Sequence, residues 1–224
     1  MSVLIAIIVF VGFSRTYYLA SVFHPRPLPS IIVHIHGAVF TCWILLLLVQ
    51  TSLVSAHRVK IHRALGIFGA CIALLTVVLG VMAANDSILL KRRTAPGFDP
   101  KTFYAIPISE LVGFAVPVFF AFFYARRNSS VHKRLILIAT IAMMTAAFGR
   151  WPVAFLLHKP APAMLCSYSL FVLLGLYDLV STRRIQWVTM AGSAFVIFVE
   201  MMSYPVGRTA AWHAFASWMQ SWGI

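Results

Sequence analysis

Charged side chains are scarce in this chain of 224 residues, because Asp, Glu, Lys and Arg together make up only 10% of it. Soluble domains carry about 25% charged residues. The hydrophobic fraction is 61% and the mean hydropathy is +0.91. These values exclude an ordinary water-soluble domain and indicate a membrane protein.

Acidic residues are the rarest charged class, with 5 Asp and Glu against 18 Lys and Arg and a formal net charge of +13. In a soluble protein this excess would suggest a nucleic-acid partner. Here nearly all of the basic residues lie in short segments between apolar stretches, where they orient membrane helices and attract anionic lipid headgroups. We therefore expect membrane lipids as partners and no nucleic acid.

Short catalytic and metal-binding motifs are also missing. The sequence contains neither HExxH nor CxxCH, and its 3 cysteines fit no disulfide or metal spacing. The last apolar stretch has no lysine that could hold retinal, and no pairing of a nucleophile with a base stands out. Whether the chain is an enzyme stays open on this evidence.

Long apolar runs are what the sequence has in abundance. Seven stretches of 18 to 24 residues approach the roughly 20 residues that an α-helix needs to cross about 30 Å of hydrocarbon. A helix also satisfies its own backbone hydrogen bonds in lipid. We therefore expect an all-α integral membrane bundle of seven transmembrane helices within residues 1–204. The expected helices cover residues 2–22, 31–54, 64–84, 104–124, 135–157, 163–180 and 185–204.

Basic residues favour one orientation of this bundle. The loops after the second, fourth and sixth expected helices hold nine Lys and Arg, and the loops on the opposite side hold seven. The positive-inside rule then predicts that the N-terminus lies inside and the C-terminus outside.

Two polar segments lie outside the expected helices. The loop 85–103 contains KRRTAPGFDPK and is either a plain connector or a mobile flap that contacts a partner. Residues 205–224 form a separate C-terminal segment, in which Trp212, Phe215, Met219 and Trp222 recur on one helical face. That spacing predicts an amphipathic helix lying in the outer interface.

A weak internal repeat pairs the first and fifth expected helices. Phe13, Ser14 and Arg15 precede a His-Pro pair that begins at His24, while residues 148–150 carry Phe-Gly-Arg ahead of a His-Lys-Pro run at 158–160. This pairing predicts a 3+1+3 arrangement of parallel repeats, which some small transporters use.

Five ionisable residues inside the apolar stretches lie at a similar depth. Each is 4 to 7 residues from the outer end of its expected helix, and therefore roughly 6 to 10 Å below the outer surface. Ionisable side chains in hydrocarbon are costly, so such groups normally face inward and pair. They predict a polar pocket, although structural ion pairs or snorkelling side chains would give the same pattern. The five are Arg15, His36, Glu110, Arg150 and Glu200.

Such a pocket suits a small anionic or amphiphilic ligand, which the protein would bind and could also transport. The two arginines would hold the anion, because guanidinium groups match carboxylates and phosphates. The two glutamates would balance them in the empty site, and the histidine would be the titratable member. Gln50 shares a helix face with His36 and would lie deeper along the path. The candidate ligand-binding residues are therefore Arg15, His36, Gln50, Glu110, Arg150 and Glu200.

Two other functions fit the same residues. A haem b or quinone-linked redox protein would take one iron ligand from each of two helices at matched depth, out of His36, His62, His132, His158 and His213. A non-catalytic assembly or scaffold subunit would use the polar layer for helix packing, and a homo-oligomer stays open. Zinc held by His36 with either glutamate lacks a third clear ligand.

Several segments resemble an uncharacterised family of bacterial multi-spanning inner-membrane proteins, a domain of unknown function. These segments are FVGFSRTYYL, HIHGAVFTCWILLLLVQTSL, HRALG, HKRLILIATI and GRWP, spread over roughly the first two-thirds of the chain. The resemblance implies a bacterial cytoplasmic membrane and no particular activity. The pattern of that family implies recurring roles for Arg15, His36, Trp43, Gln50, His62 and Arg150.

Overall fold

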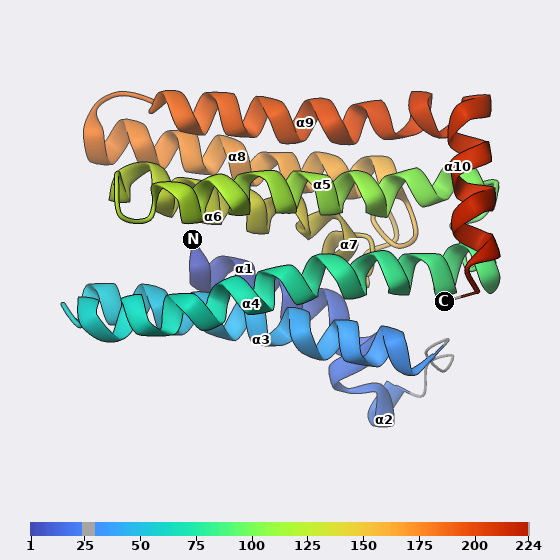
Figure 1. Cartoon of the computed structure of the whole chain (residues 1–224), viewed down its shortest axis with the longest axis horizontal. Coiled ribbons are helices and arrows are strands. Elements are labelled where there is room, and N and C mark those ends of the chain that lie inside the picture. The colour runs from blue at the N-terminus through green and yellow to red at the C-terminus, as the bar shows by residue number, and fades with distance from the viewer. Residues whose placement is uncertain (24–29, 224) are drawn as a thin grey trace.

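The computed structural model describes residues 1–23 and 30–223, and every regular element in those residues is a helix (Figure 1). This confirms the expected all-α class. Two π-helical segments, η1 (Ser14–Tyr18) and η2 (Asn85–Leu90), extend α1 and α4. The α-helices are α1 (Ser2–Phe13), α2 (Ala20–Phe23), α3 (Ile31–Ser55), α4 (Val59–Ala84), α5 (Pro100–Tyr124), α6 (Ser129–Ala142), α7 (Met144–Phe148), α8 (Pro160–Thr182), α9 (Trp187–Gly207) and α10 (Ala210–Ser221).

Six helices within the described residues are long and apolar enough to cross a membrane. They are α3, α4 with η2, α5, α6 with α7, α8 and α9. The chain is therefore a multi-pass membrane protein. The first expected helix, 2–22, is shorter than predicted, because its continuous helical part ends at Tyr18. The His24 side of the suggested repeat falls on residues 24–29, outside the described residues.

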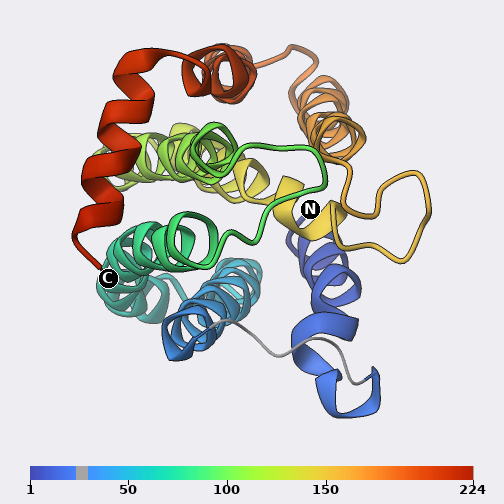
Figure 2. The ribbon, with the colours of Figure 1, turned by 90° about the vertical axis from the view of Figure 1, so that its right-hand side faces the viewer.

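The long helices lie side by side along the longest axis of the molecule (Figure 1). Helix α5 packs against α4, α6 and α9, and the end view shows it between α4 and α9 (Figure 2). The connections 56–58, 125–128 and 183–186 gather at one end, which we call the basic end after its arginines. At the opposite end α10 lies across the bundle, so we call that the α10 end.

The loop predicted at 85–103 is shorter in the structure. Helix α4 continues into η2, and α5 already begins at Pro100, so only residues 91–99 lack helical structure. Asp99 caps α5 by accepting a hydrogen bond from the Thr102 N–H at 2.9 Å. Pro100 suits the first helical position, because a backbone N–H there would have no partner within the helix. The predicted helix began only at residue 104, because its bounds followed the apolar pattern and the first turn of α5 is polar.

The helix predicted at 135–157 ends early. Helix α7 stops at Phe148, and residues 149–159 form an irregular segment that closes on itself, with the His158 N–H donating to the Gly149 carbonyl at 2.9 Å. Pro152 disfavours helical geometry at the residue before it and cannot donate a backbone hydrogen bond. Arg150 therefore lies just beyond a helix and not within one.

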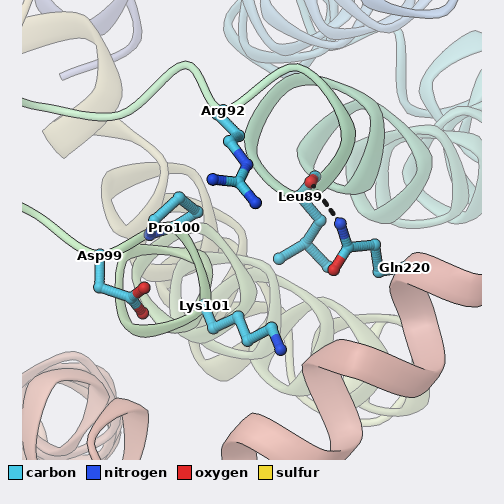
Figure 3. Close-up of a pocket in the computed structure, with 6 residues that line it drawn as sticks. All are labelled: Leu89, Arg92, Asp99, Pro100, Lys101 and Gln220. Carbon is cyan, nitrogen blue, oxygen red and sulfur yellow. Dashed lines mark hydrogen bonds between the residues drawn. The ribbon is translucent and has the colours of Figure 1, made fainter.

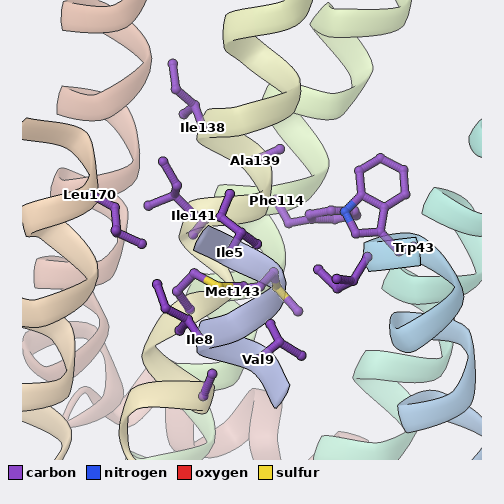
Figure 4. Close-up of a cluster of buried hydrophobic side chains, with 14 of the residues drawn as sticks. Ile5, Ile8, Val9, Trp43, Phe114, Ile138, Ala139, Ile141, Met143 and Leu170 are labelled. Atoms are coloured by element: carbon purple, nitrogen blue, oxygen red, sulfur yellow. The ribbon is translucent and has the colours of Figure 1, made fainter. Parts of the chain in front are cut away.

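The core lies where α1, α3, α5, α6 and α8 meet (Figure 4). The Trp43 ring packs edge-on against Phe114 with centroids 5.2 Å apart, and its indole N–H donates to the Thr140 hydroxyl at 3.2 Å. Helix α1 approaches α7 closely, because a Cβ at Gly12 would overlap the Ala147 carbonyl group. This contact fixes α7, and with it the segment that carries Arg150.

A buried ion pair joins α6 to α8 near the basic end. Arg134 is 2% exposed and Asp178 is 0% exposed. The guanidinium donates to Asp178 Oδ1 from Nε at 2.9 Å and from Nη2 at 2.5 Å. Asp178 Oδ2 accepts from the Thr189 hydroxyl at 2.6 Å and from the Gln186 N–H at 3.2 Å. Both charges are thus compensated, as a buried pair requires.

Helix α10 is bound to the ends of its neighbours by apolar and polar contacts. Trp212 and Met219 pack with buried Ala216 against Leu89 and Tyr104, whereas Phe215 and Trp222 are exposed. Side-chain hydrogen bonds then tie α10 to η2 and to the first turn of α5. They run from Asn85 to the Met219 carbonyl (3.1 Å), from Gln220 to the Leu89 carbonyl (3.1 Å), from Trp212 to the Lys101 carbonyl (2.8 Å) and from Lys101 to the Ser217 hydroxyl (2.7 Å).

The Asp99 cap gives a testable contribution to stability. The Thr102 backbone N–H, and more weakly the His213 ring, hold the pKa of the Asp99 carboxyl below its ordinary 3.8. A lowered folded-state pKa means that the contribution is present above pH 3.8 and is lost as pH falls through the lower folded value. We expect Asp99→Ala to cost about 1 kcal/mol at neutral pH.

Thermal unfolding of both proteins at neutral and strongly acidic pH checks this. The difference between wild type and Asp99→Ala should shrink in acid, because the protonated carboxyl caps poorly. Asp99→Asn is the matched control, since asparagine also caps helices and does not titrate. A difference that stays constant with pH would contradict the assigned cap.

Candidate functional site

Five polar side chains from five different segments approach one another inside the α10 half of the bundle. We call them the polar centre: His36 of α3, Glu110 of α5, Arg150 after α7, Tyr168 of α8 and Glu200 of α9. The predicted residues His36, Glu110, Arg150 and Glu200 are all among them. The structure therefore brings together four of the six candidate ligand-binding residues.

The charges of this centre lie within electrostatic range of one another. Arg150 lies within range of both His36 and Glu110. Glu110 lies within range of Glu200 and Tyr168, and Tyr168 lies beside Glu200. Glu110 thus connects the arginine with the pair formed by Glu200 and Tyr168.

Local packing fixes Arg150 in this position. Its Nη1 donates to the Ala146 carbonyl at 2.5 Å, and its guanidinium lies 4.9 Å from the centre of the Phe13 ring. The neighbouring Trp151 indole donates to the Ile8 carbonyl of α1 at 3.3 Å. The Arg150 side chain still keeps exposed surface.

Glycines let the other members come close. A Cβ at Gly80 of α4 would lie 3.3 Å from the His36 ring, so this ring packs directly on the α4 backbone. A Cβ at Gly113, one turn after Glu110, would lie 3.2 Å from Ala142 and 3.4 Å from Val196. Helices α5, α6 and α9 therefore pack tightly on the side of the glutamates that faces the basic end.

The acidic residues of the chain divide into two kinds. Each of the three aspartates lies within 4.0 Å of a basic side chain, which is Lys91, His213 or Arg134. Glu110 and Glu200 are 6% and 2% exposed, and neither has an ion-pair partner within that distance among the described residues. The glutamates are therefore the buried acids without a direct ion pair among the described residues.

Hydrogen bonding in the centre is also incomplete. Both Glu200 oxygens, the Tyr168 hydroxyl and His36 Nδ1 are buried without a hydrogen bond of normal geometry to any residue in the described part of the chain. Buried polar groups in folded proteins are nearly always bonded, so a group left unbonded calls for a specific explanation. A ligand that donates to the carboxylate would complete the set.

Two predicted site residues lie elsewhere. The Arg15 guanidinium lies 5.2 Å from the centre of the Phe23 ring and is exposed. Gln50 lies toward the basic end, where its amide nitrogen comes within 4.0 Å of a Cβ placed at Gly66. Tyr168 is the member that sequence reasoning missed, since a tyrosine in an apolar helix carries no charge to mark it.

The histidines proposed as haem ligands are mostly dispersed. His158 is exposed within the irregular segment 149–159, and His213 contacts Thr102 at the α10 end. His62 and His132 alone form a ring contact within the proposed set, with centroids 6.3 Å apart at the basic end. The described residues contain no group of three or more His, Cys, Asp or Glu that could hold a metal ion.

A small surface hollow of about 70 Å³ opens beside α10, lined by Leu89, Arg92, Asp99, Pro100, Lys101 and Gln220 (Figure 3). The Gln220–Leu89 hydrogen bond crosses one side of it. Glu110 lies nine residues further along α5 than Lys101, about 14 Å away at 1.5 Å per residue. The hollow is therefore separate from the polar centre.

Comparison with models of protein families, with curated proteins and with solved structures finds no match to this chain. The helices themselves show a multi-helix membrane protein with six candidate spans within the described residues. The polar centre is therefore the feature from which a function can be inferred.

Proposed function

We propose that this membrane protein binds a small anionic or amphiphilic ligand at the polar centre. One observation carries the proposal: Glu200 is 2% exposed, both its oxygens lack a hydrogen bond of normal geometry to any described residue, and an arginine with exposed surface lies in the same centre. Ionisable residues at membrane depth are costly and usually mark a functional site. Structural ion pairs would instead be closed, as Arg134 and Asp178 are.

The members of the centre have distinct roles in this proposal. Arg150 binds the anionic group, because its planar donors match a carboxylate or phosphate. Glu200 and Tyr168 accept from and donate to a polar group at the other end of the ligand. His36 is the proton-linked member. Arg15 and Gln50 lie outside the centre and have no role in this proposal.

The finer membrane assignment belongs to the same proposal. We place the centre in the outer half of a bacterial cytoplasmic membrane, with the basic end inside, because cytoplasmic loops carry the excess of Lys and Arg. Ser2–Tyr18 would serve as a seventh, shorter span of a 3+1+3 repeat. Broken helices beside a site recur in transporters, and α7 ends just before Arg150, so the proposal extends to transport.

Thermal unfolding of the detergent-purified protein tests the proposal. The probes are short- and medium-chain alkyl carboxylates and alkyl phosphates, with the matching alcohols as uncharged controls. A ligand at one hundred times its Kd stabilises the folded protein by about 2.7 kcal/mol. We expect at least one anionic probe to raise the Tm of wild type and to have no effect on Arg150→Ala.

Arg15→Ala is the matched control, because that arginine is exposed and lies outside the centre. It should keep the wild-type response. Arg150→Lys should respond weakly, since an ammonium keeps the charge without the planar pair of donors. Equal stabilisation of wild type and Arg150→Ala by every probe would refute the proposed anion site.

A further inference from the structure

A second polar group lies at the basic end, away from the polar centre. His62 and His132 are each the fourth residue of their helix, α4 and α6 respectively. Their ring centroids are 6.3 Å apart, with an angle of 78° between the ring planes. Imidazole rings from two helices therefore meet at the same depth, although α4 and α6 are separated along the chain by α5.

The tautomer of His132 follows from its hydrogen bond. Nδ1 lies 2.8 Å from the Ala121 carbonyl oxygen of α5. A carbonyl oxygen only accepts, so Nδ1 carries the hydrogen and Nε2 of the neutral ring keeps its lone pair. This arrangement, with one nitrogen bonded to a backbone carbonyl and the other unprotonated, is the usual state of a metal-binding histidine.

The other side of the contact holds two unbonded acceptors. The His62 ring lies near the Gln50 backbone, and its Nδ1 is buried with no hydrogen-bond partner in the described residues. The Gln50 side-chain oxygen is likewise buried and unbonded among those residues. Its amide nitrogen comes close to Gly66, one turn after His62, which places this side chain along the same face of α4.

We propose that His62 and His132 bind a first-row transition-metal ion, zinc or copper, with the Gln50 carbonyl oxygen as a third ligand. Imidazole nitrogens suit these two metals. A metal about 2.0–2.1 Å from each nitrogen holds two imidazole centroids roughly 5 to 6.5 Å apart. The tetrahedral angle that zinc prefers brings the centroids to about 5 Å. From the observed 6.3 Å, binding therefore requires ring rotation and an approach of the two rings by about 1 Å.

Nearby charge determines how the coordination is completed. Arg63 follows His62 and Lys133 follows His132, so both neighbours are cationic, and no described Asp or Glu pairs with either. A divalent ion there would gain from an anionic fourth ligand such as hydroxide or chloride. The site is independent of the polar centre, and either proposal can fail alone.

Metal titration of the purified full chain tests this site. The protein is prepared without a polyhistidine tag, stripped with a chelator, and titrated with Zn²⁺ and with Cu²⁺ in competition with a metal-binding dye. We expect one ion per chain. His62→Ala and His132→Ala should each weaken binding by at least about tenfold, the cost of losing even an outer-shell partner.

His57→Asn is the matched control. His57 is exposed at the same end and has a φ of 57°, which asparagine tolerates, so binding should be unchanged. Electron paramagnetic resonance of Cu²⁺ bound to wild type adds a test that needs no variant, and two nitrogen ligands are expected. Binding that is absent, oxygen-only or equal in wild type and both alanine variants would overturn the proposal. So would a Soret band in the purified protein, which would assign the histidines to haem.

Discussion

Replacing Asp178 with alanine should lower the free energy of unfolding by roughly 3–5 kcal/mol, the usual cost of removing one partner of a buried ion pair. The variant leaves the Arg134 guanidinium, which is 2% exposed, without its counter-ion. The Thr189 hydroxyl and the Gln186 N–H also lose their acceptor. We expect a large fall in Tm or in folded yield, measured in a single detergent.

A double variant separates the loss of the pair from the loss of packing. Arg134→Met with Asp178→Leu removes both charges and keeps apolar volume, and replacing buried pairs in this way is often neutral or stabilising. It should recover much of the stability lost in Asp178→Ala. If the single and double variants were equally unstable, the charge balance would not be the cause.

The second large effect has the opposite sign. Glu200→Met should raise the unfolding free energy, because it removes a buried carboxyl group that no described residue compensates. We expect a gain on the order of 1–2 kcal/mol, below the ~3 kcal/mol that insertion scales assign to a charge at the helix centre. In a chain of this size that corresponds to a rise in Tm of roughly 2–8 °C.

The same variant should lose its response to the anionic probes, which would reveal a trade between stability and binding. Glu200→Gln keeps the polarity and removes the charge, so it should fall between wild type and Glu200→Met. Tyr204→Phe, at an exposed position of the same helix, should change neither property. Destabilisation by Glu200→Gln would show a carboxylate bonded in the folded protein, and would favour a packing role for the centre.

The membrane class was accessible from the sequence, because hydropathy and helix length are averages over many residues. The depth of each polar residue along its helix could also be predicted from the sequence. This depth placed Glu110 and Glu200, which lie in two distant segments, in the same predicted pocket. The direction in which each helix turns its polar side chains could not be predicted, because these helices are apolar on all sides. Arg15 lies at a suitable depth, yet its guanidinium contacts the Phe23 ring. No Asp or Glu forms an ion pair with it among the described residues.

The buried pair shows a different limit. Arg134 follows Lys133 at a helix start, so it was counted with the loop cations, and Asp178 lies near the end of an apolar stretch. Their pairing depends on how α6 packs against α8, which no pattern within either segment encodes. Arg150 was placed inside a helix because the apolar run continues to residue 157, whereas Gly149 and Pro152 end the helix earlier.

The crossing of α10 over the bundle restricts which movements are inexpensive. Hydrogen bonds from α10 tie η2 and the first turn of α5 together, so separating these elements breaks several contacts at once. The opposite flank, made of α1, α7 and the segment 149–159, is joined by the hydrogen bond from the Trp151 indole to the Ile8 carbonyl. An opening motion at the α10 end would therefore have to break the contacts of η2, α5 and α10 together.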